Sequence, residues 1–197
     1  MRRRLAPVAV AVAFALLLAG CSNDPLAEQY REGSNKNYIA GDGAVTEIDV
    51  SNRDEPIEFS GTTESGTTVT SADYAGEVLV VNFWFASCAP CRAEARDLQA
   101  LNERFDGKGA SFLGVNVRDQ TDTAAAFEKT FGVTYPSVID ANDAAVQLAF
   151  TGKVPANAVP TTLVLDAQGR VAARILGQLQ ERSILETLIR DTIAEGE

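Results

Sequence analysis

A near-continuous apolar run that leads into a pair of cysteines constrains the fold of this chain more than any other feature. Residues Val78 to Phe85 read VLVVNFWF, which is typical of a strand buried on both faces of a sheet. Cys88-Ala89-Pro90-Cys91 follows, and apolar side chains then recur at helical spacing from Pro90 to Phe105. The sequence therefore predicts a C-x-x-C motif at the junction between a buried strand and a helix.

The position of this motif predicts different tasks for the two cysteines. Two intervening residues on a first helical turn bring both sulfurs within disulfide reach. Cys88 is expected to lie exposed at the helix N-terminus, where unpaired N–H groups and the helix dipole stabilise a thiolate. Cys88 should therefore attack a disulfide, and Cys91, one turn into the helix, should resolve the mixed disulfide. Pro90 fits the first turn, where no N–H is needed.

Other uses of the cysteine pair are less favoured. A structural disulfide across two residues would close a very short loop and would stabilise the fold little. A metal half-site would need partner ligands, but the chain has three cysteines and no histidine. The lack of histidine also excludes Ser-His-Asp and Cys-His catalysis and histidine-ligated metal or haem. The net charge of −10 argues against a nucleic-acid partner. We expect no metal.

Residues 1–20 are predicted to be a secretory signal peptide. Arg2-Arg3-Arg4 precede an apolar stretch from Leu5 to Ala19, which is shorter than the roughly 20 residues that span a bilayer. The stretch ends in Leu18-Ala19-Gly20-Cys21, which resembles the bacterial lipobox, in which the cysteine is lipidated and becomes the new N-terminus. Cys21 is then a lipid anchor at the extracytoplasmic face of the cell membrane, where disulfides persist. The alternative is an uncleaved anchor with an incidental cysteine.

Residues 21–55 are mostly polar and are predicted to be the lipidated cysteine followed by a flexible tether. Within it, two strand-like runs flank Gly41-Asp42-Gly43, which indicates a possible hairpin over residues 38–48. The main domain is expected over residues 56–197.

This main domain is expected to open with a hairpin formed by Ile57–Thr62 and Thr67–Thr70. Strands then alternate with helices, which implies a βαβ unit, and an antiparallel pair closes the sheet. The sequence predicts an α/β fold with a mixed central sheet, helices on both faces and an N-terminal β-hairpin. Further strands are expected at Ser111–Val117, Thr161–Leu165 and Arg170–Leu176, and helices at Thr123–Phe131, Asp143–Phe150 and Glu181–Ala194.

Two segments resemble a known family. The stretch VLVVNFWFASCAPCRAEARDL (78–98) and the later AVPTTLVLDAQGRV (158–171) resemble the TlpA-like and ResA-like thiol-disulfide oxidoreductases of the thioredoxin fold. The resemblance covers residues 56–197 and implies that Pro160 follows a cis peptide bond and faces the dithiol. It also implies that Val159 presents backbone groups to an extended substrate chain. Trp84 is predicted to form part of the wall beside the dithiol, with core packing as the alternative.

The resemblance implies different roles for two polar residues near the dithiol, Asn82 and Glu94. Cytosolic thioredoxin-like proteins carry a buried Asp before Phe-Trp, whereas this chain has Asn82, which cannot transfer a proton. Glu94 matches an acid that TlpA-like and ResA-like proteins have three residues after the second cysteine. It could accept the Cys91 proton or tune the pKa values of both thiols. A solvated helix charge is the alternative. Ser87 and Arg96 depart from the family pattern, which often has Trp and Pro there. Ser87 is expected to change the substrate surface beside Cys88, and Arg96 affects a helix kink rather than the chemistry.

The resemblance implies an enzyme that needs no cofactor and reduces disulfides of exported proteins such as apocytochrome c. Electrons would come from a membrane thiol carrier, because no cytosolic reductase reaches this compartment. The dipeptide between the cysteines contains no histidine, which favours a reductant over a strong oxidant. An extracytoplasmic oxidant or isomerase that uses the same dithiol is the alternative.

Two further functions are less favoured by the sequence. Peroxiredoxins place Thr three residues before the attacking cysteine and Pro four residues before that, where this chain has Phe85 and Val81. A lipoprotein that uses the fold only to bind a partner would not need its cysteines. We expect a monomer.

Overall fold

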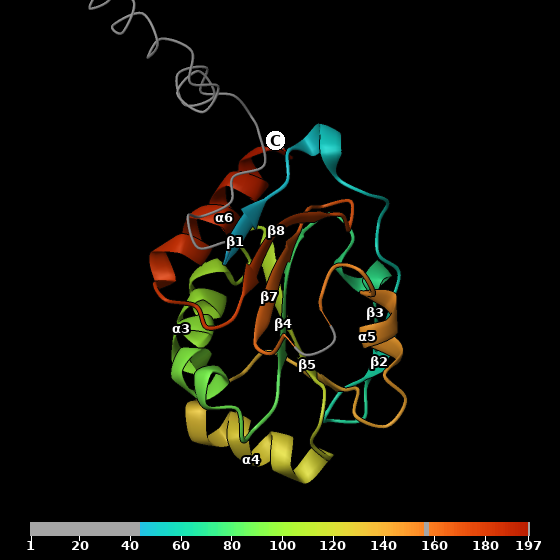
Figure 1. Ribbon diagram of the computed structural model, residues 1–197, viewed down its shortest axis with the longest axis vertical. Coiled ribbons are helices and arrows are strands. Elements are labelled where there is room, and N and C mark those ends of the chain that lie inside the picture. Colours follow the sequence, from blue (N-terminus) through green and yellow to red (C-terminus); the bar gives the residue numbers. More distant parts are fainter. Residues whose placement is uncertain (1–43, 156–157, 197) are drawn as a thin grey trace, which may run out of the picture. The chain divides into compact units, whose positions relative to one another are not determined.

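The computed structural model describes residues 44–155 and 158–196. Its centre is a six-stranded mixed sheet with the strand order β1-β8-β7-β4-β5-β6 (Figure 1). Strands β4, β5 and β6 run parallel, and β7, β8 and β1 extend the sheet by antiparallel pairing. The strand bounds are Val45–Glu47 (β1), Val78–Trp84 (β4), Ala110–Asn116 (β5), Ser137–Ile139 (β6), Thr161–Leu165 (β7) and Val171–Leu176 (β8).

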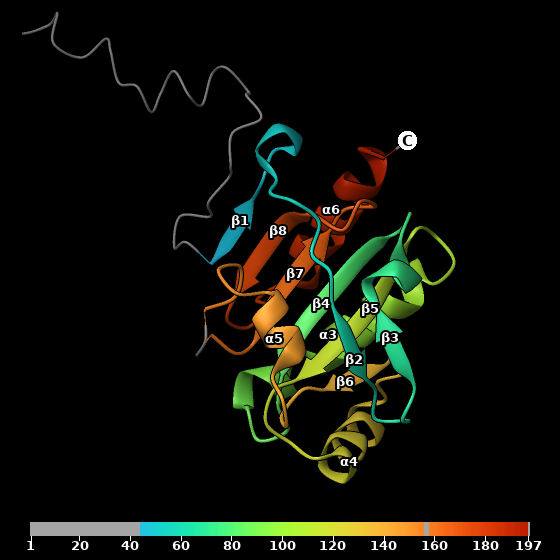
Figure 2. The same ribbon diagram turned by 90° about the vertical axis from the view of Figure 1, so that its right-hand side faces the viewer.

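Helices cover both faces of this sheet, as the sequence predicts. One face carries α3 and α6, and the other carries α5 and the two-stranded sheet β2–β3 (Figures 1 and 2). The bounds are Ala89–Phe105 (α3), Thr121–Phe131 (α4), Ala145–Ala149 (α5), Arg182–Ala194 (α6), Ser60–Thr62 (β2) and Thr68–Thr70 (β3), with 3₁₀ turns at Val50–Asn52 and Ser71–Tyr74. In the part of the chain that is described, no helix has the length and apolar character needed to cross a membrane.

Strand β4 is buried along its whole length, which explains its near-continuous apolar sequence. Successive side chains of a strand point to opposite faces. Val78 and Val80 therefore pack toward α3 and α6, while Leu79, Val81 and Phe83 pack toward α5 and the β2–β3 hairpin. The predicted strand, and the motif at its end, are thus held between two apolar cores.

Strand β6 has only three residues, too few to show a periodic pattern, and it was not expected. Strand β1 lies within the second strand-like run of the possible hairpin over residues 38–48. It pairs with β8 at the sheet edge, so the sheet begins before the predicted domain start at residue 56. The remainder of the predicted hairpin, residues 38–43, lies outside the described residues, as do Cys21 and the predicted signal peptide.

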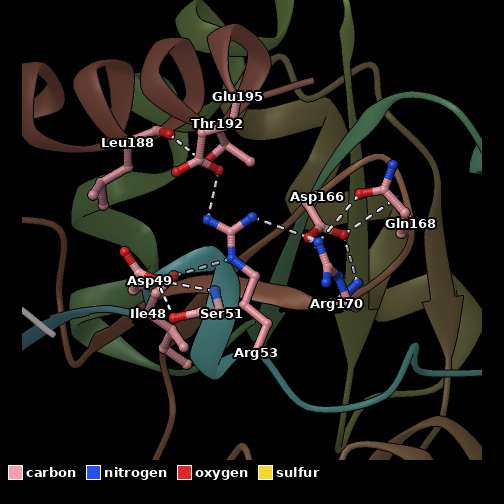
Figure 3. A network of polar contacts seen from close by, with 10 residues as sticks. All are labelled: Ile48, Asp49, Ser51, Arg53, Asp166, Gln168, Arg170, Leu188, Thr192 and Glu195. Carbon is pink, nitrogen blue, oxygen red and sulfur yellow. Dashed lines mark hydrogen bonds and ion pairs between the residues drawn. The ribbon is translucent and has the colours of Figure 1, made fainter. Parts of the chain in front are cut away.

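Arg53 fastens the segment after β1 to the rest of the domain (Figure 3). Its buried guanidinium donates to Asp166 Oδ2 at 3.0 Å and to Glu195 Oε2 at 2.5 Å, and its Nε donates to the carbonyl of Ile48 at 3.0 Å. Asp166 lies in the β7–β8 turn and also accepts from Arg170. One side chain therefore joins the N-terminal segment, a sheet turn and the end of α6.

We expect Arg53→Ala to lower the free energy of unfolding by about 1–3 kcal/mol, because it leaves the buried Asp166 carboxylate with fewer partners. Burial alone would raise the pKa of Asp166, but bonds from the Arg170 backbone, Arg53 and Arg170 outweigh it and hold the pKa below its usual range. The effect of Arg53→Ala should therefore be full above about pH 4 and shrink as the pH falls through that lowered pKa. Urea denaturation at several pH values measures it.

Arg104→Ala is the matched control, because it removes an ion pair between an exposed arginine and the half-buried Glu186. It should change stability by about 0.5 kcal/mol or less. Equal losses for both variants would contradict the role given to Arg53.

Candidate active site

The two cysteines lie where β4 ends and α3 begins, and they form a disulfide. Cys88 is the N-cap residue of α3, and its Sγ accepts a hydrogen bond from the backbone N–H of Cys91 at 3.2 Å. Pro90 occupies the first turn, as predicted. The Cα atoms of Cys88 and Cys91 are 5.3 Å apart, so the pair can open and close with the helix in place.

The prediction that Cys88 lies exposed is wrong for this disulfide form. Cys88 is 5% exposed and Cys91 is 2% exposed. Apolar side chains from the end of β4, from α3 and from α4 enclose the pair: Trp84, Ala95, Ala124 and Phe127, with Val159 packed against the same cluster. Cys88 is still the more exposed of the two, which is the order that the sequence predicts.

Asp119 holds the loop that carries Cys88, and sequence reasoning missed it. Its Oδ2 accepts from the backbone N–H of Ala86 at 2.6 Å. Buried Asn116 donates to the same Oδ2 at 2.9 Å and accepts from the backbone N–H of Asp119 at 2.7 Å. Because Asp119 follows a different strand, β5, no local pattern around the cysteines points to it.

The segment before β7 faces the dithiol cluster. The Val159–Pro160 peptide bond is cis, as the resemblance implies. Val159 packs against the cysteine cluster, and among the described residues no partner binds its backbone N–H or C=O. Val159 also borders an apolar pocket of about 480 Å³ that reaches Leu148 on α5. The structure therefore brings Val159 and Pro160 to the cysteines.

Trp84 also belongs to the cysteine cluster, but its indole is buried. Its ring packs on Phe127 with the ring centroids 4.4 Å apart. Trp84 lies beside Cys91 in the interior rather than on an open surface, so it supports the wall of the site by packing behind it.

Glu94 lies on α3, three residues after Cys91, and is buried rather than solvated. It is 1% exposed, and its two oxygens accept from Asn82 Nδ2 at 3.0 Å and from the backbone N–H of Leu179 at 2.7 Å. Asn82 Nδ2 also donates to Thr162 Oγ1 at 3.0 Å, which links Glu94 to the strand that follows Pro160. Burial raises the pKa of Glu94 to about 7, although the two hydrogen bonds oppose this rise.

A metal site is not evident in this region. Within residues 44–155 and 158–196, no group of three or more Cys, Asp and Glu side chains could hold a metal ion. The groups that the structure does place here are the cysteine pair and the buried carboxyl of Glu94.

Known proteins are similar to this chain in both sequence and fold. The model of the AhpC/TSA family matches residues 53–174, which is more than half of the chain. The chain belongs to the AhpC/TSA family. Its fold matches a secreted thiol-disulfide isomerase from Corynebacterium glutamicum, with a TM-score of 0.70, 31% identity and coverage of 82% of this chain and 99% of that one. A DsbF homologue from Corynebacterium diphtheriae matches with a TM-score of 0.68, 36% identity and coverage of 81% and 99%.

Curated relatives of this AhpC/TSA-family chain carry names from thiol-disulfide chemistry. "Thiol-disulfide oxidoreductase ResA" of Geobacillus thermodenitrificans is 31% identical over 59% of this chain and 64% of the relative. "Thiol:disulfide interchange protein HelX" of Rhodobacter capsulatus is 34% identical over 57% and 60%. The chain thus spans a little over three fifths of the length of these relatives. The predicted thioredoxin-like fold and the resemblance to ResA-like proteins are confirmed.

The raised pKa of Glu94 predicts a pH dependence of stability. The neutral carboxyl is favoured in the folded state, so this contribution is full below about pH 4.5 and is lost as the pH rises through about 7. The loss is on the order of 3 kcal/mol. Glu94→Gln cannot ionise, so its unfolding free energy should fall less between pH 5 and pH 8 than that of the wild type. Urea denaturation of the disulfide form at both pH values measures the difference.

Glu58→Gln serves as the control, because Glu58 is an exposed acid of the same domain. It should follow the wild-type pH dependence. A Glu94→Gln profile parallel to that of the wild type would show that Glu94 is already ionised at pH 5.

Proposed function

We propose that this chain is a thiol-disulfide oxidoreductase that acts on protein disulfides. The observation that carries the proposal is the placement of Cys88: it caps α3, is joined to Cys91, and packs in one cluster with Val159. The names of the ResA and HelX relatives support the same reaction class.

The geometry supports a two-step exchange. In the reduced form, the N–H of Cys91 that now donates to Cys88 Sγ would stabilise a Cys88 thiolate. This thiolate attacks a substrate disulfide and releases one substrate thiolate. Cys91 then attacks the Cys88 sulfur, forms the Cys88–Cys91 bond and releases the second substrate thiolate. The dithiol loses two electrons and the substrate disulfide gains them.

The backbone of Val159 supports an extended polypeptide as the substrate. Its N–H and C=O have no partner among the described residues and lie at the edge of the cysteine cluster. An extended chain can pair with such groups in the manner of an added strand. Pro160 holds this segment in place, because its carbonyl accepts from Gly177 N–H at 2.9 Å.

Reduction is the favoured direction, with exported proteins such as apocytochrome c as substrates and a membrane thiol carrier as the electron source. Strong oxidants of this fold carry a histidine between the two cysteines that stabilises the thiolate. This chain has Ala89-Pro90 there instead. The second candidate is an extracytoplasmic oxidant or isomerase, which is favoured by the 31% identity to a protein described as a secreted thiol-disulfide isomerase.

Peroxidase chemistry is not favoured despite the family. The positions at which peroxiredoxins carry Thr and Pro hold Phe85 and Val81, and Val81 is fully buried in β4. Neither side chain can donate a hydrogen bond to a peroxide.

Substitution of single cysteines tests the proposed exchange. Cys88→Ser should abolish the reduction of a disulfide-bonded peptide by the full chain, because the remaining described cysteine, Cys91, lies inside α3 and is more deeply buried than Cys88. Cys91→Ser should react once and then remain as a mixed disulfide between Cys88 and the peptide. Mass spectrometry under non-reducing conditions measures both. Exchange by Cys88→Ser at the wild-type rate would contradict the proposal.

The redox state of the pair in cells separates the two directions. Thiol trapping should find Cys88 and Cys91 reduced at steady state if the protein is a reductant, and oxidised if it is an oxidant or isomerase. A lipoprotein that only binds a partner would keep its phenotype when both cysteines are changed to Ser.

We also propose that Cys21 anchors the protein by lipidation at the extracytoplasmic face of the cell membrane. Mass spectrometry of the membrane fraction should then find a chain that begins at Cys21 and carries the mass of the lipid. Cys21→Ser should retain residues 1–20, because the lipobox can no longer be processed. A wild-type chain that also retains residues 1–20 would favour the uncleaved anchor.

A further inference from the structure

Two aromatic rings that pack against the cysteine cluster each lie under an arginine side chain. Phe85, in the loop between β4 and α3, and Phe131, the last residue of α4, both contact this cluster. The guanidinium carbon of Arg118 lies 4.1 Å from the centroid of the Phe85 ring, and that of Arg92 lies 5.1 Å from the centroid of the Phe131 ring. Both arginines are exposed. Two cations therefore lie at the rim of the dithiol site.

The aromatic rings and one hydrogen bond restrain these two cations. The face of an aromatic ring attracts a guanidinium, and a guanidinium held there keeps N–H donors available for a carboxylate. Arg92 also donates from Nη1 to the carbonyl of Ala86 at 3.3 Å. Ala86 belongs to the loop whose N–H is bound by Asp119. Both charges are thus in position before a substrate arrives.

No carboxylate of the described chain neutralises either arginine. Within residues 44–155 and 158–196, neither Arg92 nor Arg118 forms an ion pair. Asp119 follows Arg118 in the sequence, but its Oδ2 accepts from the Ala86 N–H and from Asn116 Nδ2. The chain has a net charge of −10, so most of its surface repels an acidic partner. The rim of the site is the place where such a partner would be attracted.

Arg118 and Val159 flank the end of β4 from opposite sides. Strands β5 and β7 pair with β4 on its two edges. Arg118 lies two residues after β5, and Val159 lies two residues before β7, which runs in the opposite direction. Neighbouring strands are about 4.8 Å apart, and one extended residue covers about 3.3 Å. A substrate strand that pairs with Val159 and passes Cys88 therefore has the length to reach Arg118 within about three residues.

We propose that Arg118 and Arg92 select protein disulfides in which an aspartate or glutamate lies within about three residues of the cysteine that Cys88 attacks. This inference rests on the proposed function and adds a class of substrate to it. The substrate carboxylate accepts N–H groups from the two guanidinium groups while the substrate sulfur lies at Cys88. Exposed charges of this kind act mainly on the rate of association, and salt screens them.

Peptides of different charge test this selection. The reduced full-length protein is mixed with three disulfide-bonded peptides that are identical except for Glu, Gln or Lys near the cysteine. The second-order rate constant of each reduction is then measured. At low salt the Glu peptide should react about 5-fold faster than the Lys peptide. This Glu-to-Lys ratio should approach 1 at about 1 M salt, where the Debye length is only about 3 Å.

Variants assign the selection to the two arginines. Arg118→Gln and Arg92→Gln should each lower the Glu-to-Lys ratio to about 2. Arg118→Lys should retain part of the ratio, because it keeps the charge but loses the planar guanidinium. Arg190→Gln is the matched control and should retain the wild-type ratio. Arg190 is an exposed arginine beside the C-terminal end of α3, whereas Cys88 caps the other end of this helix.

The ratio separates substrate selection from a general effect on the thiol. If the arginines only stabilised a Cys88 thiolate, Arg118→Gln would slow all three peptides by the same factor, and this result would overturn the inference. Equal rates for the three peptides with the wild type would also overturn it. The salt dependence of the wild type decides if a variant does not fold. A wild type that reduces none of the peptides would instead overturn the proposed function.

Discussion

The hydrogen bond from the Cys91 N–H to Cys88 Sγ marks where α3 begins, with Cys88 as the N-cap four residues after the end of β4. A helix start leaves its first N–H groups without backbone partners, and a side chain at the N-cap position usually satisfies one of them. Here the sulfur of Cys88 does so. The atom that the proposed reaction uses is therefore the same atom that begins the helix, and the position of the site depends directly on the fold.

A buried polar layer holds this junction against the rest of the domain. Asn82 joins Glu94 on α3 to Thr162 on β7, and Glu94 accepts from the backbone of Leu179 after β8. Each of these residues forms at least one hydrogen bond within the layer. The layer therefore fixes the positions of β4, α3 and the segment that contains Val159 relative to one another. It also explains why asparagine is suitable at position 82: a carboxylate there would face Glu94 and repel it.

Residues near the cysteines in sequence could be predicted, whereas those brought in by the fold could not. Local patterns predicted the buried strand, the helix with its Pro90 turn, and the β2–β3 hairpin, because each depends on side chains a few positions apart. The cis bond before Pro160 followed from the resemblance. Asp119 was missed because it follows another strand, β5, and has no local signature. Burial of Cys88 was missed for the same reason, since α4 supplies the cover.

The chain has no histidine, and its structure provides other groups that titrate near neutral pH. At neutral pH a protein without histidine must use another group if it is to gain and lose protons readily. Burial supplies such groups here, because Glu94 and Glu128 both have a pKa of about 7. They come from different helices, α3 and α4, and both carboxyls help to raise the pKa of Tyr135. Because desolvation raises both values, the apolar packing that encloses the disulfide also gives the site its titrating groups. A substitution that opened this packing to water would therefore lower both pKa values together, even without contact with either cysteine.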